Sequence, residues 1–368
     1  RVSAEPPEDR LRFARALVFN ALIGATDAHA RNYSLLLGSR DARLAPLYDL
    51  NTWAGYGPLA SAELAMSVGG ETRVGSERFY PEERPVHTVT VPSLYVDTHP
   101  ITNDRFAEFV ADTGWVTVAE RPLDPADYPG ADPDLLHPGG VVFRPPPGPV
   151  PLDDPSRWWA YVPGASWRHP RGPGSDISGL GDHPVVQVSF EDAAAFAEWR
   201  GARLATEAEW ERAARGGLVG AEYCWGDEPY PDDRQLANTW QGRFPWEDLA
   251  LDGWSGTSPV GSFPPNGYGL FDMAGNVWEW TTDWWSDERG SSGGACCSGG
   301  AAADPARAAV EAERESAAVG ERYGRKVIKG GSHLCAPSYC HRFRPAARQP
   351  EALDTATCHI GFRCVLDA

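Results

Sequence analysis

Two cysteines of this chain lie at a spacing that allows both thiols to reach one point. Cys335 and Cys340 are five residues apart, and Pro337 between them forces a non-helical path. Thiolates are soft ligands, and in a loop without a carboxylate they favour Cu(I) over Mg²⁺, Ca²⁺ or Mn²⁺. Zinc would require a closed set of four ligands, of which this loop supplies two. On spacing alone, two buried structural thiols remain the simpler interpretation.

A second group of candidate ligands carries oxygen instead of sulfur. Four polar side chains stand among predicted loops and turns, with main-chain carbonyls nearby: Asn238, Asp252, Asp272 and Glu279, with the carbonyls of Thr239, Trp254, Gly275 and Val277. Ca²⁺ binds six to eight oxygens, including carbonyls, and suits irregular loops. Ordinary turn and capping roles explain the same residue types. The pattern alone therefore leaves a calcium site and plain turns as alternatives.

The composition describes a loop-rich globular protein with an acidic surface. The 368 residues include 39 Gly, 33 Pro and 15 Trp, and 42% of the chain is hydrophobic. Helix interiors tolerate neither Gly nor Pro, so loops and turns must dominate. The net charge of −18 excludes nucleic acid and anionic membranes as partners, and no apolar run approaches the roughly 20 residues of a membrane span. Seven cysteines do not form a secreted disulfide framework, which favours a cytoplasmic protein.

Periodicity and capping signals predict a few short elements around these candidates. We expect a strand over residues 86–91, a helix that Thr102 caps and Gly114 ends, a helix from Ser189 to Trp199, and a helix from the capping box at Thr206 to Arg215. Residues 121–183 are rich in Pro, Gly and Asp without periodicity and predict long irregular structure. Residues 286–322 predict a flexible insert with a solvated helix in its Ala/Glu half.

The first 70 residues differ in sequence pattern from the rest of the chain. The runs TDAHARN at residues 26–32 and PLYD at 46–49 resemble the C-terminal lobe of HipA-type serine kinases. That resemblance implies a catalytic Asp27 and metal-binding Asn32 and Asp49. The nucleotide-binding lobe is missing, and there is no upstream Gly-rich loop or phosphate-binding lysine. We therefore expect residues 1–70 to be a non-catalytic kinase-like fragment, or a fusion from sequence assembly, followed by a second domain over 71–368.

From about residue 74 to 365 the sequence resembles the formylglycine-generating enzymes, also called sulfatase-modifying factors. The segments that carry the resemblance are YPEERPVH at 80–87, TN at 102–103, LATEAEW at 204–210, NGYGL at 266–270, GNVWEW at 275–280, the cysteine loop at 330–344 and GFRC at 361–364. The resemblance implies an α+β fold of low regular secondary structure, with the C-type-lectin-like arrangement of that family. A groove for an extended peptide should cross the cysteine loop.

The same resemblance implies an oxidase. Cys335 and Cys340 would bind Cu(I), Ser332 and Trp278 would line the oxygen site, and Tyr339 would orient the loop. The implied reaction uses O₂ and a reductant to convert the cysteine of a C-x-P-x-R motif, in an unfolded or nascent sulfatase polypeptide, to formylglycine. The expected protein is a monomer. The chain has no dinucleotide fingerprint, and redox chemistry needs a metal or cofactor, which agrees with copper.

The family's ligand pattern also implies two structural calcium sites. The first set is Asn238, Thr239, Asp252 and Trp254, and the second is Asp272, Gly275, Val277 and Glu279. The family's disulfide positions are incomplete, because Cys364 would face Ala197, and Ala214 and Pro345 occupy the other pair. His359 stands where many members have Asn, and Ala336 replaces a polar residue, so details of substrate contact are open.

Three other functions remain to be weighed. A non-catalytic member of the same fold would act as a binding module, although retention of both loop cysteines argues against it. An iron sulfoxide synthase would need a helical domain with a three-His site, and residues 1–70 hold only His29. A phosphotransferase in the N-terminal segment would lack half of its fold.

Overall fold

The computed structural model describes residues 35–37, 42–44, 68–125, 136–287, 305–318 and 323–368. The chain divides into two units, residues 1–66 and residues 67–368. In the first unit a short antiparallel pair is described, β1 (Leu35–Leu37) with β2 (Ala42–Leu44). Asp27, Asn32 and Asp49 lie outside the described residues, so the kinase-like assignments stay predictions.

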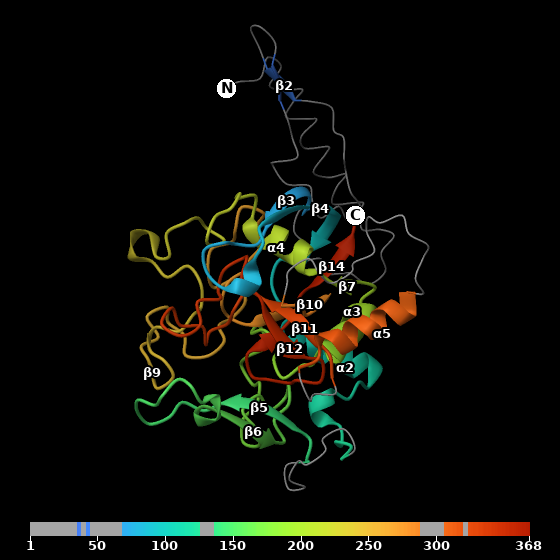
Figure 1. Cartoon of the computed structure of the whole chain (residues 1–368), viewed down its shortest axis with the longest axis vertical. Coiled ribbons are helices and arrows are strands. Elements are labelled where there is room, and N and C mark those ends of the chain that lie inside the picture. The colour runs from blue at the N-terminus through green and yellow to red at the C-terminus, as the bar shows by residue number, and fades with distance from the viewer. Residues whose placement is uncertain (1–34, 38–41, 45–67, 126–135, 288–304, 319–322) are drawn as a thin grey trace. The chain divides into compact units, whose positions relative to one another are not determined.

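Two four-stranded sheets organise the second unit. One has the order β12-β11-β10-β13 and the other β3-β4-β14-β7 (Figure 1). The strands of the first are β10 (Trp278–Trp284), β11 (Arg325–Lys329), β12 (Gln349–Ala352) and β13 (Ile360–Gly361). Those of the second are β3 (Val68–Val74), β4 (His87–Val96), β7 (Arg203–Leu204) and β14 (Cys364–Asp367). The second sheet therefore joins the start of this unit to the end of the chain, with Val96 opposite Val365.

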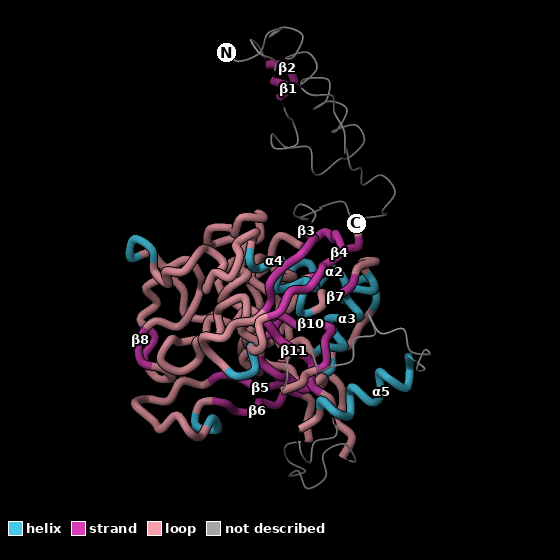
Figure 2. The backbone as a smooth tube through the Cα atoms, turned by 45° about the horizontal axis from the view of Figure 1, so that its top comes forward, coloured by secondary structure: helices cyan, strands magenta, loops and turns pink. Residues whose placement is uncertain are grey.

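Four helices accompany the sheets. They are α2 (Asn103–Thr113), α3 (Phe190–Trp199), α4 (Glu207–Arg215) and α5 (Pro305–Ser316), and Figure 2 shows α2, α3 and α5 on one side of the unit while loops fill the other. Short 3₁₀ turns lie at Pro81–Glu83, Val118–Glu120, Pro155–Arg157 and Pro231–Asp233. None of the helices in the described ranges is both long and apolar enough to cross a bilayer.

The capping signals in the sequence are confirmed. The Thr102 hydroxyl accepts from the Arg105 N–H at the start of α2, and Gly114 ends that helix with a φ of 68°. Ser189 and Thr206 each head a reciprocal capping box, with Asp192 and Glu209 as the third helical residues. Side chains thus satisfy orphan N–H groups at the starts of α2, α3 and α4, as the spacing predicted.

One prediction about the irregular region was wrong. Residues 121–183 contain an antiparallel hairpin, β5 (Gly139–Phe143) with β6 (Trp159–Pro163), where Phe143 lies opposite Trp159. A second small pair, β8 (Gly242–Arg243) with β9 (Glu247–Asp248), follows further along. The long proline-rich connection between β5 and β6 hides the pairing from a local pattern. The Ala/Glu half of the 286–322 insert forms α5 as predicted, and residues 288–304 and 319–322 lie outside the described residues.

Aromatic side chains pack the core between α2 and α3. Phe106 contacts Phe109, Trp167, Phe196 and Phe362 with ring centroids 5.3–6.4 Å apart. Phe106 and Phe196 are fully buried. Large rings fill space that short, irregular elements could not fill with aliphatic side chains, which explains the high tryptophan content.

Candidate active site

The cysteine loop follows strand β11 through two glycines. Gly330 and Gly331 have φ values of 94° and 71°, in the left-handed region that favours glycine. A Cβ on Gly331 would lie 2.9 Å from the Phe343 main chain, so only glycine allows the two ends of the loop to approach. The Cys340 N–H closes the loop by donating to the Ala336 carbonyl over 2.7 Å. The sequence therefore brings Cys335 and Cys340 together through local backbone geometry.

The two thiols meet as predicted. Their sulfurs are 3.1 Å apart, and both cysteines are free. Cys335 is buried, with the Ser332 N–H 3.4 Å from its sulfur, whereas Cys340 is partly exposed. A disulfide would require about 2.05 Å between sulfurs, so this arrangement is a thiol pair. One sulfur is thus accessible and the other is held beneath it.

Their surroundings give the two thiols opposite ionisation. The hydrogen bond from Cys335, together with the nearby Arg342 cation, lowers the pKa of Cys340 to about 7 despite burial. Burial and the hydrogen bond to Cys340 raise the pKa of Cys335 well above its ordinary value. Near neutral pH the pair therefore consists of a Cys340 thiolate that accepts a hydrogen bond from a protonated Cys335.

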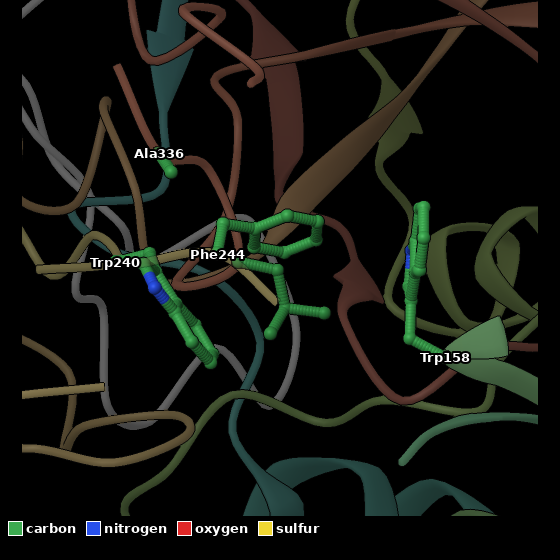
Figure 3. Packing of buried hydrophobic residues seen from close by; sticks show 5 residues of the cluster. Trp158, Trp240, Phe244 and Ala336 are labelled. Carbon is green, nitrogen blue, oxygen red and sulfur yellow. The ribbon is translucent and has the colours of Figure 1, made fainter. Parts of the chain in front are cut away.

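A cluster of buried, mostly aromatic side chains packs against the loop, and we call it the aromatic floor. It consists of Trp158, Trp240, Phe244, Leu334 and Ala336 (Figure 3). The Trp240 N–H of the main chain donates to the Cys335 carbonyl over 3.1 Å. Tyr339 stacks on Phe244 with centroids 4.5 Å apart and meets Trp158 edge-on. Tyr339 keeps 36% of its surface exposed, so it stands on this floor beside the accessible thiol.

Strand β10 brings Trp278 and Ser332 into the same region. The Asn276 carbonyl just before β10 accepts from the His333 N–H over 3.0 Å, which ties the strand to the cysteine loop. Trp278 and Ser332 are both buried. The Ser332 hydroxyl accepts from the Leu334 N–H at 3.2 Å. Ser332 thus lies directly against the thiol pair, while Trp278 lies on the adjacent strand.

Two histidines flank these residues, the partly exposed His333 and the buried His359. The Trp278 N–H donates to the His359 carbonyl over 2.9 Å, and the His359 ring lies 4.8 Å from the Trp159 ring. Burial lowers the pKa of His333 to about 4 and that of His359 to about 3. Both imidazoles are therefore neutral at physiological pH and can exchange hydrogen bonds without adding charge.

A cavity of about 370 Å³ adjoins the loop on the side of His333 and Leu334. Its walls combine aromatic rings and prolines with polar side chains in similar number, among them Phe143, Pro145, Trp240, Asn103, Arg171 and Asp248. The Asn103 Oδ1 and Trp240 Nε1 atoms are buried without a hydrogen-bond partner among the described residues. The predicted peptide groove across the two cysteines themselves is not established by this cavity, because neither thiol lines it.

The cysteine loop is also fastened from a distant part of the chain. We call residues 77–84, just before β4, the strap. The Tyr80 hydroxyl accepts from the His341 N–H over 3.1 Å, and the Glu82 carboxylate pairs with Arg342 over 2.7 Å. Part of the strap belongs to the family landmark at residues 80–87, to which the sequence alone gives no role. The signal for a role is that the acidic and aromatic side chains of the strap complement the basic side chains of residues 341–344.

The first predicted calcium set is partly assembled. One carboxylate oxygen of Asp252 accepts from the Thr239 N–H over 3.3 Å and the other accepts from the Trp254 N–H over 2.9 Å. The Gln241 amide donates to the same carboxylate and to the Thr239 carbonyl. Asn238 is buried, and its side chain donates to the Gly256 carbonyl over 2.9 Å. Two of the four predicted residues, Thr239 and Trp254, therefore contact the carboxylate of a third, Asp252.

The second set gathers around a buried carboxylate pair. Glu279 is fully buried and accepts from the Trp210 indole and from the Nε and Nη2 groups of Arg363, each over 2.7 Å. Burial raises the pKa of Asp272, and the charge of Glu279 acts in the same direction. The main chain at Gly275 passes so close to Asn238 that a Cβ there would lie 2.1 Å from its carbonyl oxygen. Val277 is buried beside them.

The donor chemistry fits the two metals differently. Across the described ranges, no three His, Cys, Asp or Glu side chains gather as a metal-binding group. Cu(I) does not need such a group, since two soft thiols meet at Cys335 and Cys340. Calcium would also need main-chain carbonyl oxygens, whereas Asp252 is contacted by the N–H groups of Thr239 and Trp254, and the Thr239 carbonyl is bonded to Gln241. The two thiols therefore fit Cu(I), while the oxygen donors of the calcium sets are only partly assembled.

Comparison with known proteins places these residues in a family. Residues 60–368 match the sulfatase-modifying factor enzyme 1-like domain, and residues 1–111 match the HipA-like C-terminal domain. The formylglycine-generating enzyme of Mycobacterium tuberculosis is 56% identical over 306 residues, covering 83% of this chain and 98% of the relative.

Two further proteins are similar to this chain, one in sequence and one in fold. A mouse protein named inactive C-alpha-formylglycine-generating enzyme 2 is 37% identical over 289 residues, covering 78% of this chain and 79% of the relative. PvdO from Pseudomonas aeruginosa shares the fold with a TM-score of 0.52 at 23% identity, covering 82% and 92% of the two chains. These matches bear out the predicted family and its α+β fold. The chain belongs to the sulfatase-modifying factor enzyme 1-like family.

Proposed function

We propose that this protein is an oxidoreductase that converts the cysteine of a C-x-P-x-R motif in sulfatase polypeptides to formylglycine. The observation that carries the proposal is the free thiol pair, whose sulfurs lie 3.1 Å apart, and the lowered pKa of Cys340 agrees with it. The Mycobacterium relative, which carries the name of this activity, supports the substrate class. The acidic surface of the chain suits a substrate arginine.

The balance of the reaction defines its co-reactants. Oxidation of a cysteine side chain to an aldehyde with release of hydrogen sulfide removes two electrons from the substrate. Reduction of O₂ to water and the aldehyde oxygen takes four, so an external reductant supplies the other two together with two protons. Bound Cu(I), held by Cys335 and Cys340, would supply the redox chemistry.

The chain's own residues have distinct tasks in this proposal. Cys340 offers an accessible thiolate, and Cys335 holds the proton that must leave before both sulfurs act as ligands. Tyr339 stacks on Phe244, which fixes the exposed side of the loop beside the substrate. Trp278 and Ser332 line the enclosed side, and the neutral His359 lies behind Trp278. The aromatic floor helps to keep the Cys335 side of the pair away from water.

Calcium would tie the long loops together. The proposed sites are Asn238, Thr239, Asp252 and Trp254 for one ion and Asp272, Gly275, Val277 and Glu279 for the other. The Arg363 cation already offsets the Glu279 charge, so this carboxylate can share its oxygens without an excess of buried negative charge. We further propose a monomer in a reducing cytoplasm, where the buried free thiol of Cys364 needs no disulfide partner.

The test is conversion of a synthetic peptide. The purified protein, loaded with Cu(I), is incubated in air with a reductant and a Cys-x-Pro-x-Arg peptide, and mass spectrometry follows loss of the thiol and gain of the aldehyde. Cys335→Ser and Cys340→Ser should each abolish conversion, while Cys224→Ser, a buried thiol outside the loop, should retain it.

The alternative is a binding module of the same fold, which the inactive mouse relative makes concrete. A wild-type protein that binds the peptide but neither converts it nor binds copper through the loop thiols would establish that alternative. Copper binding without conversion would instead point to a different peptide motif.

A further inference from the structure

A partly buried cation stands beside the thiol pair, and the reaction as described so far gives it no task. Arg342 follows Cys340 by two residues, and its positive charge acts on Cys335, Tyr339 and Cys340 alike. The Arg342 Nε–H group is buried and has no hydrogen-bond partner among the described residues. Buried N–H groups in native proteins are almost always paired, so this donor points to an acceptor that binds there.

The strap holds this guanidinium in place on its other side. One terminal nitrogen of Arg342 donates to Glu82 over 2.7 Å, and the guanidinium carbon lies 3.9 Å from the centre of the Tyr80 ring. Tyr80 also binds the His341 N–H. Glu82 and Tyr80, which together we call the clamp, therefore contact one terminal nitrogen and one face of the guanidinium. They leave the Nε–H without a hydrogen-bond partner among the described residues.

The neighbouring residues make this position rigid. Arg344 pairs with Glu83, both are fully buried, and the Arg344 guanidinium also lies 3.7 Å from the Phe79 ring centre. The His341 ring meets Phe79 edge-on at 5.2 Å. Residues 341, 342 and 344 are thus each fixed to the strap, and Arg342 cannot move away without breaking contacts on both sides.

Charge counting indicates what the cation serves. One Cu(I) with two thiolates carries a net charge of −1, and a substrate thiolate brings it to −2. A charge that is mostly removed from water needs a fixed counter-charge or hydrogen bonds. Glu82 partly offsets Arg342, but its side chain keeps 20% of its surface exposed and is screened by water, whereas Cys335 is buried and Cys340 only partly exposed.

We propose that Arg342, clamped by Tyr80 and Glu82, is the positioning residue that stabilises the anionic thiolate centre and donates its free N–H to a sulfur of that centre. This inference rests on the proposed copper site. It assigns the strap a task in the reaction, namely to hold a cation against the sulfurs, in addition to its packing against the loop.

The experiment measures Cu(I) affinity by competition with a chromophoric Cu(I) chelator, alongside thermal unfolding of each variant. Arg342→Gln should bind Cu(I) about 10–100-fold more weakly than wild type, as removal of an outer partner of a metal ligand typically does. Arg342→Lys should recover part of the loss because it restores the charge without the planar fork. Arg78→Gln is the matched control, since Arg78 is an exposed arginine of the same strap.

A second variant separates electrostatics from packing. Glu82→Gln keeps an acceptor for Arg342 but removes the opposing charge, so the charge role predicts unchanged or tighter copper binding. A purely structural clamp predicts weaker binding in Glu82→Gln and Arg342→Gln alike, with matching losses of melting temperature, and that result would overturn the inference. Equal affinity in Arg342→Gln and wild type would overturn it as well.

These outcomes differ from failure of the proposed function. If wild type and Cys340→Ser bind Cu(I) equally, then the loop thiols are not the copper site and the proposed function itself fails. If wild type binds through the thiols and Arg342→Gln matches it, then only the role of Arg342 is refuted.

Discussion

Two residues of one type acquire different chemistry within 3.1 Å of each other. Cys335 is shielded by the loop and Cys340 reaches the surface beside a cation, so the pair shares one proton unequally. The sequence identifies both residues and gives no hint of this asymmetry, because it arises from burial and from Arg342. At the scale of residues, the sequence predicts which two cysteines form the pair, but it does not predict which of the two thiols ionises first.

The asymmetry predicts a pH profile for thiol modification in the metal-free protein. Alkylation requires the thiolate, so the rate at Cys340 should rise as pH increases through about 7 and level off above it. Cys335→Ala removes the hydrogen bond that stabilises this thiolate and should move the midpoint upward, toward the ordinary value of 9.0. Site-resolved mass spectrometry after brief iodoacetamide treatment gives both profiles. Identical midpoints in wild type and Cys335→Ala would contradict the unequal sharing.

At the scale of elements, the glycine turn between β11 and the cysteine loop has the largest consequence. Gly331→Ala should place its Cβ against the Phe343 main chain and strain a left-handed residue, with a loss of about 1–3 kcal/mol in the free energy of unfolding. Gly220→Ala has a similar φ of 70° and open space around its Cβ, so it measures the conformational cost alone. Chemical denaturation compares the two.

The Gly331→Ala substitution should also move the sulfurs of Cys335 and Cys340 apart, because the turn sets the path of the loop. Copper affinity should therefore fall in Gly331→Ala and stay unchanged in Gly220→Ala. Equal stability and equal affinity in the two variants would show that the turn does not position the thiols.

Elements with local signals were predictable and elements that depend on distant pairing were not. The boundaries of α3 and α4 follow from capping boxes that involve neighbouring residues. The β5–β6 hairpin was missed because its strands are joined by a long proline-rich loop without periodicity. The role of the strap was missed for the same reason, since Tyr80 and His341 are 261 positions apart.

For the molecule as a whole, calcium should govern stability. Any ion that binds the folded chain alone raises its stability, by about 2.7 kcal/mol at a concentration 100 times the Kd. Chelation with EGTA should therefore lower the melting temperature, and added Ca²⁺ should restore it. Asp272→Ala should remove part of this response, whereas Asp176→Ala, at an exposed loop carboxylate, should leave it intact. A melting temperature indifferent to calcium would refute both sites.

The contact between Tyr80 and His341 also sets the order in which the site can appear during synthesis. The ribosome releases the strap early, but its partner loop emerges only after more than two hundred and fifty further residues. A partly synthesised chain therefore contains the strap but lacks the two thiols, so it cannot assemble the proposed copper site. That site would form in one late step, when nearly all of the surrounding core has already been synthesised.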